Sequence, residues 1–352
     1  MIFRQLFDQV SSTYSYLLAS RGGGEALIID PVLEKVDRYI HLLQELDLKL
    51  VKAVDSHLHA DHITGLGALR DKTHCITVMG EQTKADVVSV RVSDGDKLTI
   101  EGLVLDVLYT PGHTDDSYSF IMPDRAFTGD TLLIRGTGRT DFQNGDPRAQ
   151  YHSIFERLLK LPDATLVYPA HDYKGDTVST IGEERAFNPR LQVKSVDEYV
   201  DVMNNLKLAN PKMMDVVIPA NMKVGFHQEE IALRGWATTP GQAIELVGRP
   251  DVVLIDLREA SERDRHGAIP GSLHIPYPTL HESISSGGAL HELAKSGNKR
   301  LLFFCAFGER SAMAVQAAQD VGLSSSCHIQ GGIDAWKKAG GTVKQLSLGQ
   351  TQ

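Results

Sequence analysis

Short apolar runs alternate with amphipathic stretches along the first two hundred residues. Residues 25–32 (EALIIDPV) form an apolar run typical of a buried strand, and residues 34–47 follow with the spacing of an amphipathic helix. The next apolar run, LVKAVDSH, leads directly into the histidine-rich segment SHLHADHITG at residues 56–65. The pattern therefore places this segment at the carboxyl end of a strand, where the functional loops of α/β proteins lie.

Further strands and helices are predicted beyond this segment. Residues 97–110 (KLTIEGLVLDVLYT) predict a hairpin that turns at the Glu-Gly pair. SYSFIMP, RAFTGD and TLVYPAHD predict strands, and two of them end in side chains that could bind a metal. A helix is predicted over residues 147–160, with Asp146 as its N-cap and proline at its first position. A second helix over residues 194–208 closes this unit near residue 225.

A different order of elements follows. Residues 226–238 lose clear periodicity and are predicted to be a linker. TTPGQAIELVG then offers a threonine cap, a proline in the first turn and a glycine stop for a helix. A strand (DVVLIDL), a helix, a strand (RLLFFC) and a helix (RSAMAVQAAQDVG) come next, which is typical of a small parallel sheet with crossover helices. We predict two α/β domains, residues 1–225 and 239–352.

Composition and charge narrow the class of protein. A length of 352 residues suits two domains, and 42% hydrophobic with 23% charged residues is typical of a soluble globular protein. A net charge of -9 without a cluster of lysine or arginine excludes nucleic acid as the expected partner. The apolar runs are strand-sized and shorter than the roughly 20 residues of a membrane helix, so we expect no membrane span. The N-terminus lacks a signal-peptide pattern and the three cysteines form no disulfide framework, so we expect a cytoplasmic protein.

Histidines and aspartates gather at the strand ends of the first domain. They are His57, His59, Asp61 and His62 in SHLHADHITG, His113 in TPGHT, Asp130 in FTGD and His171 in PAHD. Imidazole and carboxylate together suit zinc or non-haem iron, whereas calcium and magnesium prefer oxygen ligands alone. Isolated histidines such as His41, His74 and His152 are expected to be ordinary polar residues. Four candidate ligands within six residues exceed such structural needs and predict a transition-metal site.

The His-x-His-x-Asp-His motif resembles that of the metallo-β-lactamase superfamily over about residues 1–225. This resemblance implies an αββα sandwich with its metal at one edge of the two sheets. HADHITG, LLIRGTGRTDFQ, PAHDY and ERAFNPRL resemble the persulfide dioxygenase family more closely. That resemblance implies one Fe(II) per chain, held by the facial triad His57, His113 and Asp130. The remaining four residues, His59, Asp61, His62 and His171, would then orient ligands or water through hydrogen bonds.

The same resemblance implies a reaction and a substrate. Glutathione persulfide would be oxidised by O2 to sulfite and glutathione, and Arg139, Tyr173 and Arg190 would contact the glutathione part. Arginine forks and a phenol suit a tripeptide with two carboxylates, although surface ion pairs are the alternative role for these arginines. The fold by itself does not select the reaction. Because all seven ligands of dizinc enzymes such as glyoxalase II are present, a dizinc glutathione thioester hydrolase stays open as the alternative. The resemblance is also compatible with a homodimer.

A cysteine loop is the main candidate site of the second domain. In LLFFCAFGERSAM an apolar strand delivers Cys305 to a six-residue loop that ends at Arg310 and opens a helix. Backbone N–H groups of the loop, the helix N-terminus and Arg310 would stabilise a thiolate and an anionic sulfur substrate. The rest of the loop consists of Ala306, Phe307, Gly308 and Glu309. The alternative is a small hydrophobe at a strand end, and simple packing is what we expect for Cys75 and Cys327.

Residues 239–345 resemble a single rhodanese domain, through VVLIDLREASERDRHGAIPGSLHIP, the cysteine loop and GGIDAWKKAG. The resemblance implies that Cys305 accepts a sulfane sulfur and passes it on, between thiosulfate or sulfite and glutathione or its persulfide. The loop length implies a sulfur substrate rather than a phosphate. Ala306 and Phe307 depart from the commoner Cys-Arg-Ser-Gly pattern, which leaves the preferred donor open. Asp256, Arg258 and Glu259 lie where rhodanese motifs organise the loop. The prediction is a bifunctional enzyme of sulfur metabolism, with a noncatalytic regulatory rhodanese module as the alternative for this half.

Overall fold

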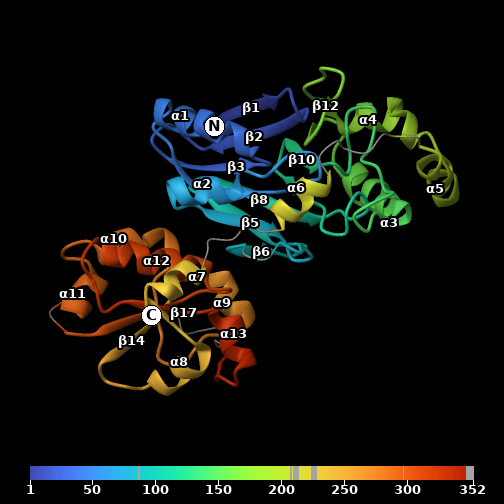
Figure 1. Ribbon diagram of the computed structural model, residues 1–352. Coiled ribbons are helices and arrows are strands. Elements are labelled where there is room, and N and C mark those ends of the chain that lie inside the picture. Colours follow the sequence, from blue (N-terminus) through green and yellow to red (C-terminus); the bar gives the residue numbers. More distant parts are fainter. Residues whose placement is uncertain (86–87, 207, 209–213, 223–227, 296, 346–352) are drawn as a thin grey trace. The chain divides into compact units, whose positions relative to one another are not determined.

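The computed structural model of the protein describes residues 1–85, 88–206, 208, 214–222, 228–295 and 297–345 (Figure 1). The chain divides into two compact units. The N-terminal unit consists of Met1–Asp86 and Val90–Val224, and the C-terminal unit of Val87–Ser89 and Gly225–Gln352. None of the described helices is long and apolar enough to cross a membrane.

The first sheet of the N-terminal unit has the strand order β1-β2-β3-β4-β5-β6. Its first three strands are antiparallel, and β3 to β6 are parallel. The strand predicted over residues 25–32 is present but ends at Ile29, because Asp30 has a left-handed backbone (φ 50°) that a strand does not accommodate. The strands are β1 (Ile2–Asp8), β2 (Thr13–Ala19), β3 (Glu25–Ile29), β4 (Lys49–Val54), β5 (Ile76–Gly80) and β6 (Val90–Val92).

The second sheet has the order β12-β11-β10-β9-β8-β7. Its predicted hairpin is confirmed: Ile100 pairs with Leu103, and Gly102 supplies the positive φ (70°) that the turn requires. Only β10 and β11 are parallel among these strands. The strands are β7 (Lys97–Ile100), β8 (Leu103–Tyr109), β9 (Tyr118–Ile121), β10 (Arg125–Gly129), β11 (Leu166–Pro169) and β12 (Ser179–Thr180).

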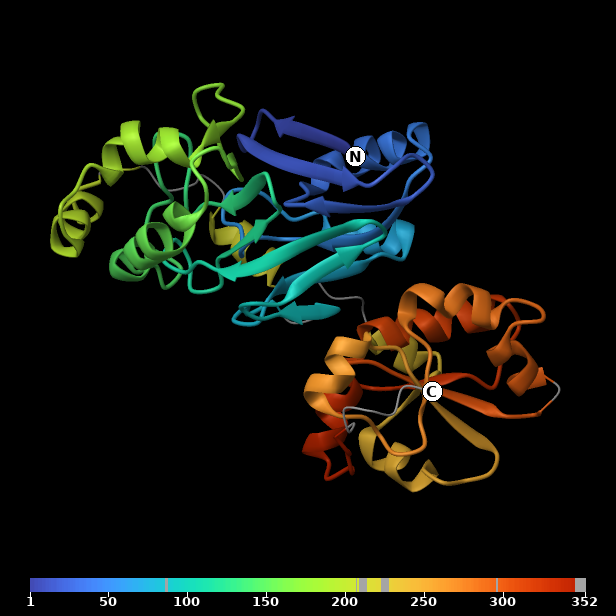
Figure 2. The ribbon, with the colours of Figure 1, turned by 180° about the vertical axis from the view of Figure 1, so that it is seen from behind.

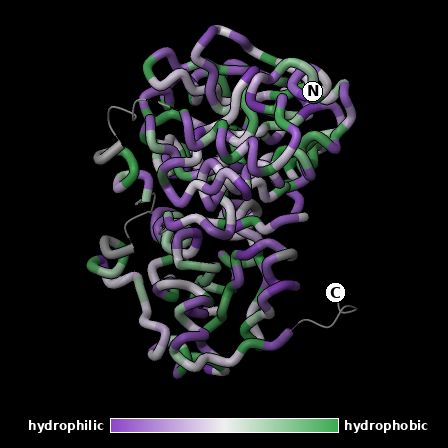
Figure 3. Tube along the Cα trace, turned by 90° about the vertical axis from the view of Figure 1, so that its right-hand side faces the viewer, coloured by the Kyte–Doolittle hydropathy of each residue, from purple (hydrophilic) through white to green (hydrophobic). Residues whose placement is uncertain are grey.

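The two sheets pack face to face around one apolar core. Leu27 and Val54 of the first sheet share this cluster with Phe120 and Phe127 of the second. Alternate strand residues point into the core, so hydrophobic stretches (green) run through the interior of the unit in Figure 3. Helices cover both outer faces, which completes the predicted αββα sandwich (Figure 2).

The helices of the N-terminal unit match the predicted ones with two differences in length. Asp146 caps the helix predicted over residues 147–160 by accepting from the Arg148 and Ala149 amides, but a π-turn interrupts that helix. The helix predicted over residues 194–208 is shorter, and residue 207 lies outside the described residues. The helical segments are η1 (Leu33–Lys35), α1 (Val36–Glu45), α2 (Leu66–Thr73), α3 (Pro147–His152), η2 (Ser153–Arg157), η3 (Leu158–Lys160), α4 (Ile181–Phe187), η4 (Pro189–Leu191), α5 (Val196–Asn204) and α6 (Met214–Asn221).

The C-terminal unit contains a parallel sheet of order β13-β17-β16-β14-β15, as predicted. Ala243, Ile333 and Trp336 pack α8 and α13 against the sheet. The strands are β13 (Ala237–Thr238), β14 (Val252–Asp256), β15 (Leu273–His274), β16 (Arg300–Phe304) and β17 (Cys327–Ile329). The helices are α7 (Gln228–Leu233), α8 (Pro240–Leu246), α9 (Ala260–His266), η5 (Tyr277–Thr279), α10 (Leu280–Ile284), α11 (Ala289–Lys295), α12 (Glu309–Asp320) and α13 (Gly332–Lys338).

The segment predicted as a linker, residues 226–238, contains two of these elements. α7 buries Ile231, and β13 pairs with β17 at the edge of the sheet. A helix of six residues and a strand of two are too short to produce a recognisable period in the sequence, which is why the pattern did not predict them. Residues 225–227 lie outside the described residues.

Candidate metal centre and cysteine loop

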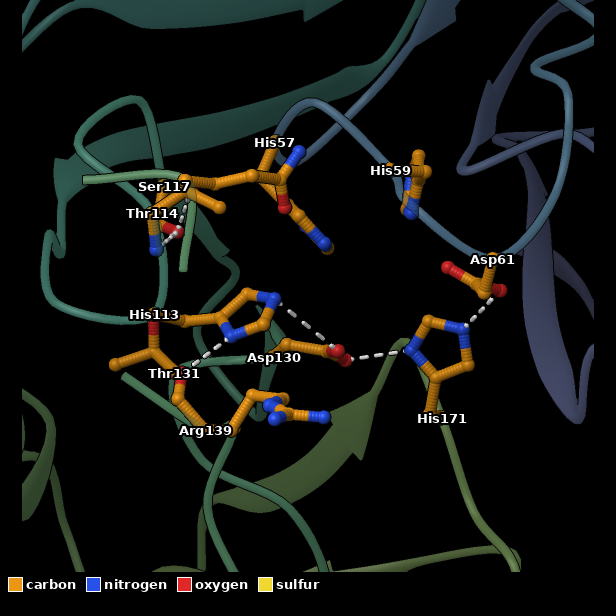
Figure 4. A network of polar contacts seen from close by, with 12 residues as sticks. His57, His59, Asp61, His113, Thr114, Ser117, Asp130, Thr131, Arg139 and His171 are labelled. Atoms are coloured by element: carbon orange, nitrogen blue, oxygen red, sulfur yellow. Dashed lines mark hydrogen bonds and ion pairs between the residues drawn. The ribbon is translucent and has the colours of Figure 1, made fainter. Parts of the chain in front are cut away.

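The three predicted metal ligands and the four residues predicted to orient them converge at one edge of the sandwich. His57 follows β4, His113 follows β8, Asp130 follows β10 and His171 follows β11, so each comes from the carboxyl end of a strand. Figure 4 shows six of these side chains facing a common space, namely His57, His59, Asp61, His113, Asp130 and His171. Their donor atoms form two groups, His57 with His113 and Asp130, and His59 with Asp61, His62 and His171, each with its donor atoms within 4.8 Å of one another.

The first group is prepared for metal binding by its hydrogen bonds. Ser56 Oγ donates to Asp30 at 2.9 Å, so His57 Nδ1, 2.9 Å from the same oxygen, must be the donor to it. Burial lowers the pKa of His57, so its ring is neutral and Nε2 carries the lone pair. His113 Nδ1 likewise donates to the Arg139 carbonyl at 2.7 Å. Both rings therefore present Nε2, which is the arrangement that metal-binding histidines require.

Asp130 supplies the negative charge of this group. Burial opposes ionisation, but the neighbouring His171 imidazole holds the pKa of Asp130 below its usual range. Asp130 Oδ2 lies 3.6 Å from His113 Nε2, and Oδ1 accepts from His171 Nδ1 at 2.7 Å. Two imidazoles and one carboxylate are the donor set of a non-haem iron triad, so these residues fit the metal that the sequence implied.

In the second group, some of the donor atoms already form hydrogen bonds within the protein. Both nitrogens of His171 contact carboxylates, Asp130 at 2.7 Å and Asp61 at 2.9 Å, and these carboxylates raise its pKa against the effect of burial. Burial likewise opposes protonation of His59, but Asp30 raises its pKa to about 9. His59 Nδ1 and His62 Nε2 are buried without a hydrogen-bond partner among the described residues. A bound water would satisfy these two nitrogens, whereas a second metal ion would require His59 to lose its proton.

A cavity of about 220 Å³ opens beside the first group, lined by His113, Asp130 and all three predicted glutathione contacts. Arg190 is half-buried and donates to the Thr137 carbonyl, and it makes no ion pair among the described residues. Arg139 is already paired, with both its Nε and Nη2 bound to Asp141 at 2.6 Å. Tyr173 is exposed and stacks on the His171 ring at 6.0 Å. Lys174, which the sequence did not single out, also lines the cavity.

Several residues that shape the metal centre were missed from the sequence. Asp30 accepts from the Ser56 amide at 2.6 Å and contacts His59 at 3.3 Å. Its position at the end of an apolar strand, before a proline, was a usable signal. Gly138 packs so tightly that a Cβ there would lie 2.3 Å from the Asp130 carbonyl oxygen and 2.7 Å from His113 Nδ1. The glycine-rich segment around it carried no indication of this contact.

The cysteine loop has the curled geometry predicted for it. Cys305 follows β16 and is buried, and the Gly308 N–H donates to its sulfur at 3.2 Å. Gly308 adopts φ 94°, which turns the loop into α12 and aims its amide at the sulfur. Ala306 and Phe307 are partly exposed, whereas Glu309 is buried. The Gly308 amide thus lies in position to donate to the Cys305 sulfur.

Arg310 is held by a residue that the sequence did not single out. Its Nη1 and Nη2 each donate to Glu262 at 2.7 Å, and Glu262 also accepts from the Glu259 amide at 2.8 Å. Burial opposes the charge of Arg310, but Glu262 raises its pKa above the usual value. Arg310 Nε is buried without a partner among the described residues. A bound anion or water would satisfy this N–H.

The other cysteines are buried in the protein interior. Cys327 is part of the core of the C-terminal unit, but its sulfur also lies 3.1 Å from Arg300 Nη2 and 3.3 Å from Thr238 Oγ1. The expectation of packing alone was therefore incomplete for Cys327, because strands distant in the sequence bring these donors to it.

Comparisons with known proteins agree with this geometry. The model of the metallo-beta-lactamase superfamily matches residues 8–86 and 80–171, and that of the rhodanese-like domain matches residues 239–339. Persulfide dioxygenase ETHE1, mitochondrial, from Homo sapiens is 46% identical over 228 residues, covering 64% of this chain and 89% of that protein. This chain belongs to the persulfide dioxygenase family. The crystal structure of ETHE1 from Myxococcus xanthus is 52% identical, with a TM-score of 0.62, and covers 63% of this chain and 98% of that one.

Membership of the persulfide dioxygenase family makes the protein an enzyme with a metal site, followed by a rhodanese-like domain. The predicted family and fold class are thereby confirmed. A hydroxyacylglutathione hydrolase from Haemophilus ducreyi is also similar, 34% identical over 219 residues, with 53% of this chain and 91% of that protein covered.

Proposed function

We propose that the N-terminal unit oxidises glutathione persulfide with O2 to sulfite and glutathione, using one Fe(II) held by His57, His113 and Asp130. Two observations support this metal site, namely the two Nε2 lone pairs and the ionised carboxylate of the first group. The bound iron would bring the persulfide sulfur and dioxygen together and supply electron density to the oxygen. His57, His113 and Asp130 would hold the iron, and three protein ligands would leave coordination positions for both reactants.

The second group is proposed to orient this centre rather than to bind iron. His171 links Asp130 to Asp61, which fixes the direction in which Asp130 presents its other oxygen. Asp61 in turn contacts His62 Nδ1 at 3.0 Å. With both nitrogens of His171 engaged by carboxylates, this ring has no lone pair to offer to a metal in the arrangement described.

The cavity beside the triad is proposed to bind the glutathione part of the substrate. Arg190 is the strongest candidate for a carboxylate partner, because its guanidinium makes no ion pair among the described residues. Lys174 offers a second cation at the same cavity. Arg139 would have to break its ion pair with Asp141 before it could bind the substrate. It therefore contributes less to the free energy of substrate binding than an arginine without an ion pair. Tyr173 is proposed to donate through its phenol.

The rhodanese-like domain is proposed to transfer sulfur through Cys305. The Cys305 thiolate attacks the outer sulfur of thiosulfate, the S–S bond breaks, and sulfite leaves with the bonding electron pair. A glutathione thiolate then attacks the sulfur held on Cys305, which regenerates the Cys305 thiolate and yields glutathione persulfide. The Gly308 amide and Arg310 Nε would stabilise the anions in this exchange. The reverse direction uses the same steps and consumes the sulfite formed by the first domain.

Metal analysis combined with oxygen uptake tests the proposal for the first domain. After anaerobic purification, we expect about one iron per chain and oxygen uptake with glutathione persulfide. The dizinc thioester hydrolase is a second candidate, favoured by the unpartnered His59 and His62 nitrogens and by the similarity to a hydroxyacylglutathione hydrolase. Two zinc ions per chain, hydrolysis of a glutathione thioester and no oxygen uptake would establish that candidate instead.

A thiosulfate-to-glutathione transfer assay tests the second domain. Transfer that requires Cys305 supports a catalytic role, whereas a protein that holds persulfide on Cys305 without turnover would be a regulatory module. The remaining proposals are a homodimeric state, no nucleic-acid or membrane partner, and a cytoplasmic location. The human relative, by contrast, is named a mitochondrial protein.

A further inference from the structure

One side chain on α6 is hydrogen-bonded to the metal-binding loop at three points. Asn221 Nδ2 donates to the carbonyl oxygens of His59 at 3.0 Å and His62 at 2.9 Å. Asn221 Oδ1 accepts from the Thr64 amide at 2.9 Å. The residue is only 2% exposed, so these bonds are not shared with bulk solvent. Three of the four hydrogen bonds available to an asparagine amide are thus spent on one loop.

The three bonded groups lie within the irregular segment 56–65, which carries the predicted ligand His57 and three of the residues predicted to orient the metal centre, His59, Asp61 and His62. This segment forms neither helix nor strand, so its backbone groups need partners from elsewhere in the protein. Asn221 supplies them on both sides of Asp61 and His62. These three hydrogen bonds all go to backbone groups of the described loop, so its effect is on the path of the loop.

We propose that Asn221 is a positioning residue of the metal centre, which holds the loop so that its histidines and aspartate converge. The superfamily match ends at residue 171, and α6 lies beyond it, near the end of the N-terminal unit. The metal centre therefore includes a support that comes from outside the matched part of the sandwich. This inference rests on the proposed metal site but does not depend on which metal occupies it.

A purely structural role would give a different result from a positioning role. If Asn221 served only to attach α6, its loss would loosen α6, whose Val217 is also buried, and leave the loop unchanged. If Asn221 positions the loop, its loss would release the Thr64 amide and loosen metal binding while α6 stays attached.

The test uses Asn221→Ala in the full chain, with Asn204→Ala as the matched control. Asn204 is exposed at the end of α5. Each protein is loaded with Fe(II) anaerobically, or with Zn(II), and transfer of the metal to a chromogenic chelator is timed. Because residues that support metal ligands typically contribute 10- to 100-fold to metal affinity, we expect release from Asn221→Ala to be faster by roughly tenfold or more. Amide hydrogen exchange should rise across residues 56–65 and remain unchanged in β2 and β3.

A second variant, Asn221→Asp, distinguishes the hydrogen bonds that Asn221 donates from the one that it accepts. It keeps an oxygen facing the Thr64 amide but removes both N–H donors, so we expect continued protection of Thr64 together with accelerated metal release. Release and loop exchange equal to those of Asn204→Ala would overturn the proposal. Unfolding of the whole unit in Asn221→Ala would also overturn it, by making the residue a general anchor of the fold. If the wild-type chain did not bind metal, the proposed function would be contradicted instead. The amide hydrogen exchange of residues 56–65 would then test the positioning role of Asn221.

Discussion

Replacing Gly138 with alanine should disable the metal centre while leaving the sandwich folded. The added Cβ would lie 2.3 Å from the Asp130 carbonyl oxygen and 2.7 Å from His113 Nδ1, whereas ordinary contact begins at 3.4 Å. Neither atom can move away easily. The Asp130 carbonyl accepts from the Gly138 amide at 2.7 Å, and the His113 ring donates to the Arg139 carbonyl. Two of the three proposed iron ligands would therefore have to shift, by up to about 1 Å.

The shift gives the expected size of the effect. A misplacement of about 1 Å can reduce a reaction rate by about 100-fold, which corresponds to about 2.7 kcal/mol of transition-state stabilisation. Metal content and oxygen uptake with glutathione persulfide should both fall. Gly136→Ala is the matched control, because its Cβ would meet no atom closer than 3.8 Å. Its metal content should equal that of the wild type.

Thermal unfolding distinguishes a damaged site from an unfolded domain. We expect Gly138→Ala to unfold cooperatively, at a somewhat lower temperature than Gly136→Ala. If Gly138→Ala retained its metal and had the same kcat/KM as the wild type, the loop would be yielding to the methyl group. The argument that Gly138 fixes His113 and Asp130 by close packing would then be wrong.

Three further predictions concern other side chains. Cys305→Ser should abolish thiosulfate-to-glutathione transfer and leave oxygen uptake unchanged, and loss of both activities would refute two separable sites. Arg190→Lys should raise the KM for glutathione persulfide roughly tenfold, as expected for loss of one charge-assisted hydrogen bond, with unchanged metal content. Glu262→Gln should destabilise the C-terminal unit by about 3 kcal/mol near neutral pH, because it breaks a buried ion pair. Burial opposes ionisation of Glu262, but Arg310 lowers the pKa of Glu262 in the folded protein. The Glu262 carboxylate therefore stabilises the folded protein at a pH above its unfolded-state pKa. This stabilisation is lost as the pH falls through its folded-state pKa. The difference in unfolding temperature between wild type and Glu262→Gln should therefore shrink on acidification, and a constant difference would contradict this account.

Local signals in the chain were sufficient for most of the fold. The apolar runs predicted β3 and the β7–β8 hairpin, and Asp146 with the proline after it predicted the start of α3. Such features depend on neighbouring residues, so they are readable without knowledge of the tertiary structure. The predictions failed for short helices and strands. α7 and β13 were assigned to a linker because their stability comes from packing and pairing with distant segments.

For the candidate sites, too, the sequence determined some features and the tertiary structure determined others. The sequence alone determined which side chains could bind a metal or attack sulfur, because imidazole, carboxylate and thiol chemistry belongs to the residue type and its spacing. Only the tertiary structure decided which partners they have. It engaged both nitrogens of His171 with carboxylates, paired Arg139 with Asp141 and Arg310 with Glu262, and brought Asn221 to the metal loop. These contacts join residues whose side-chain directions depend on how strands and loops pack, and no local pattern in the chain records that packing.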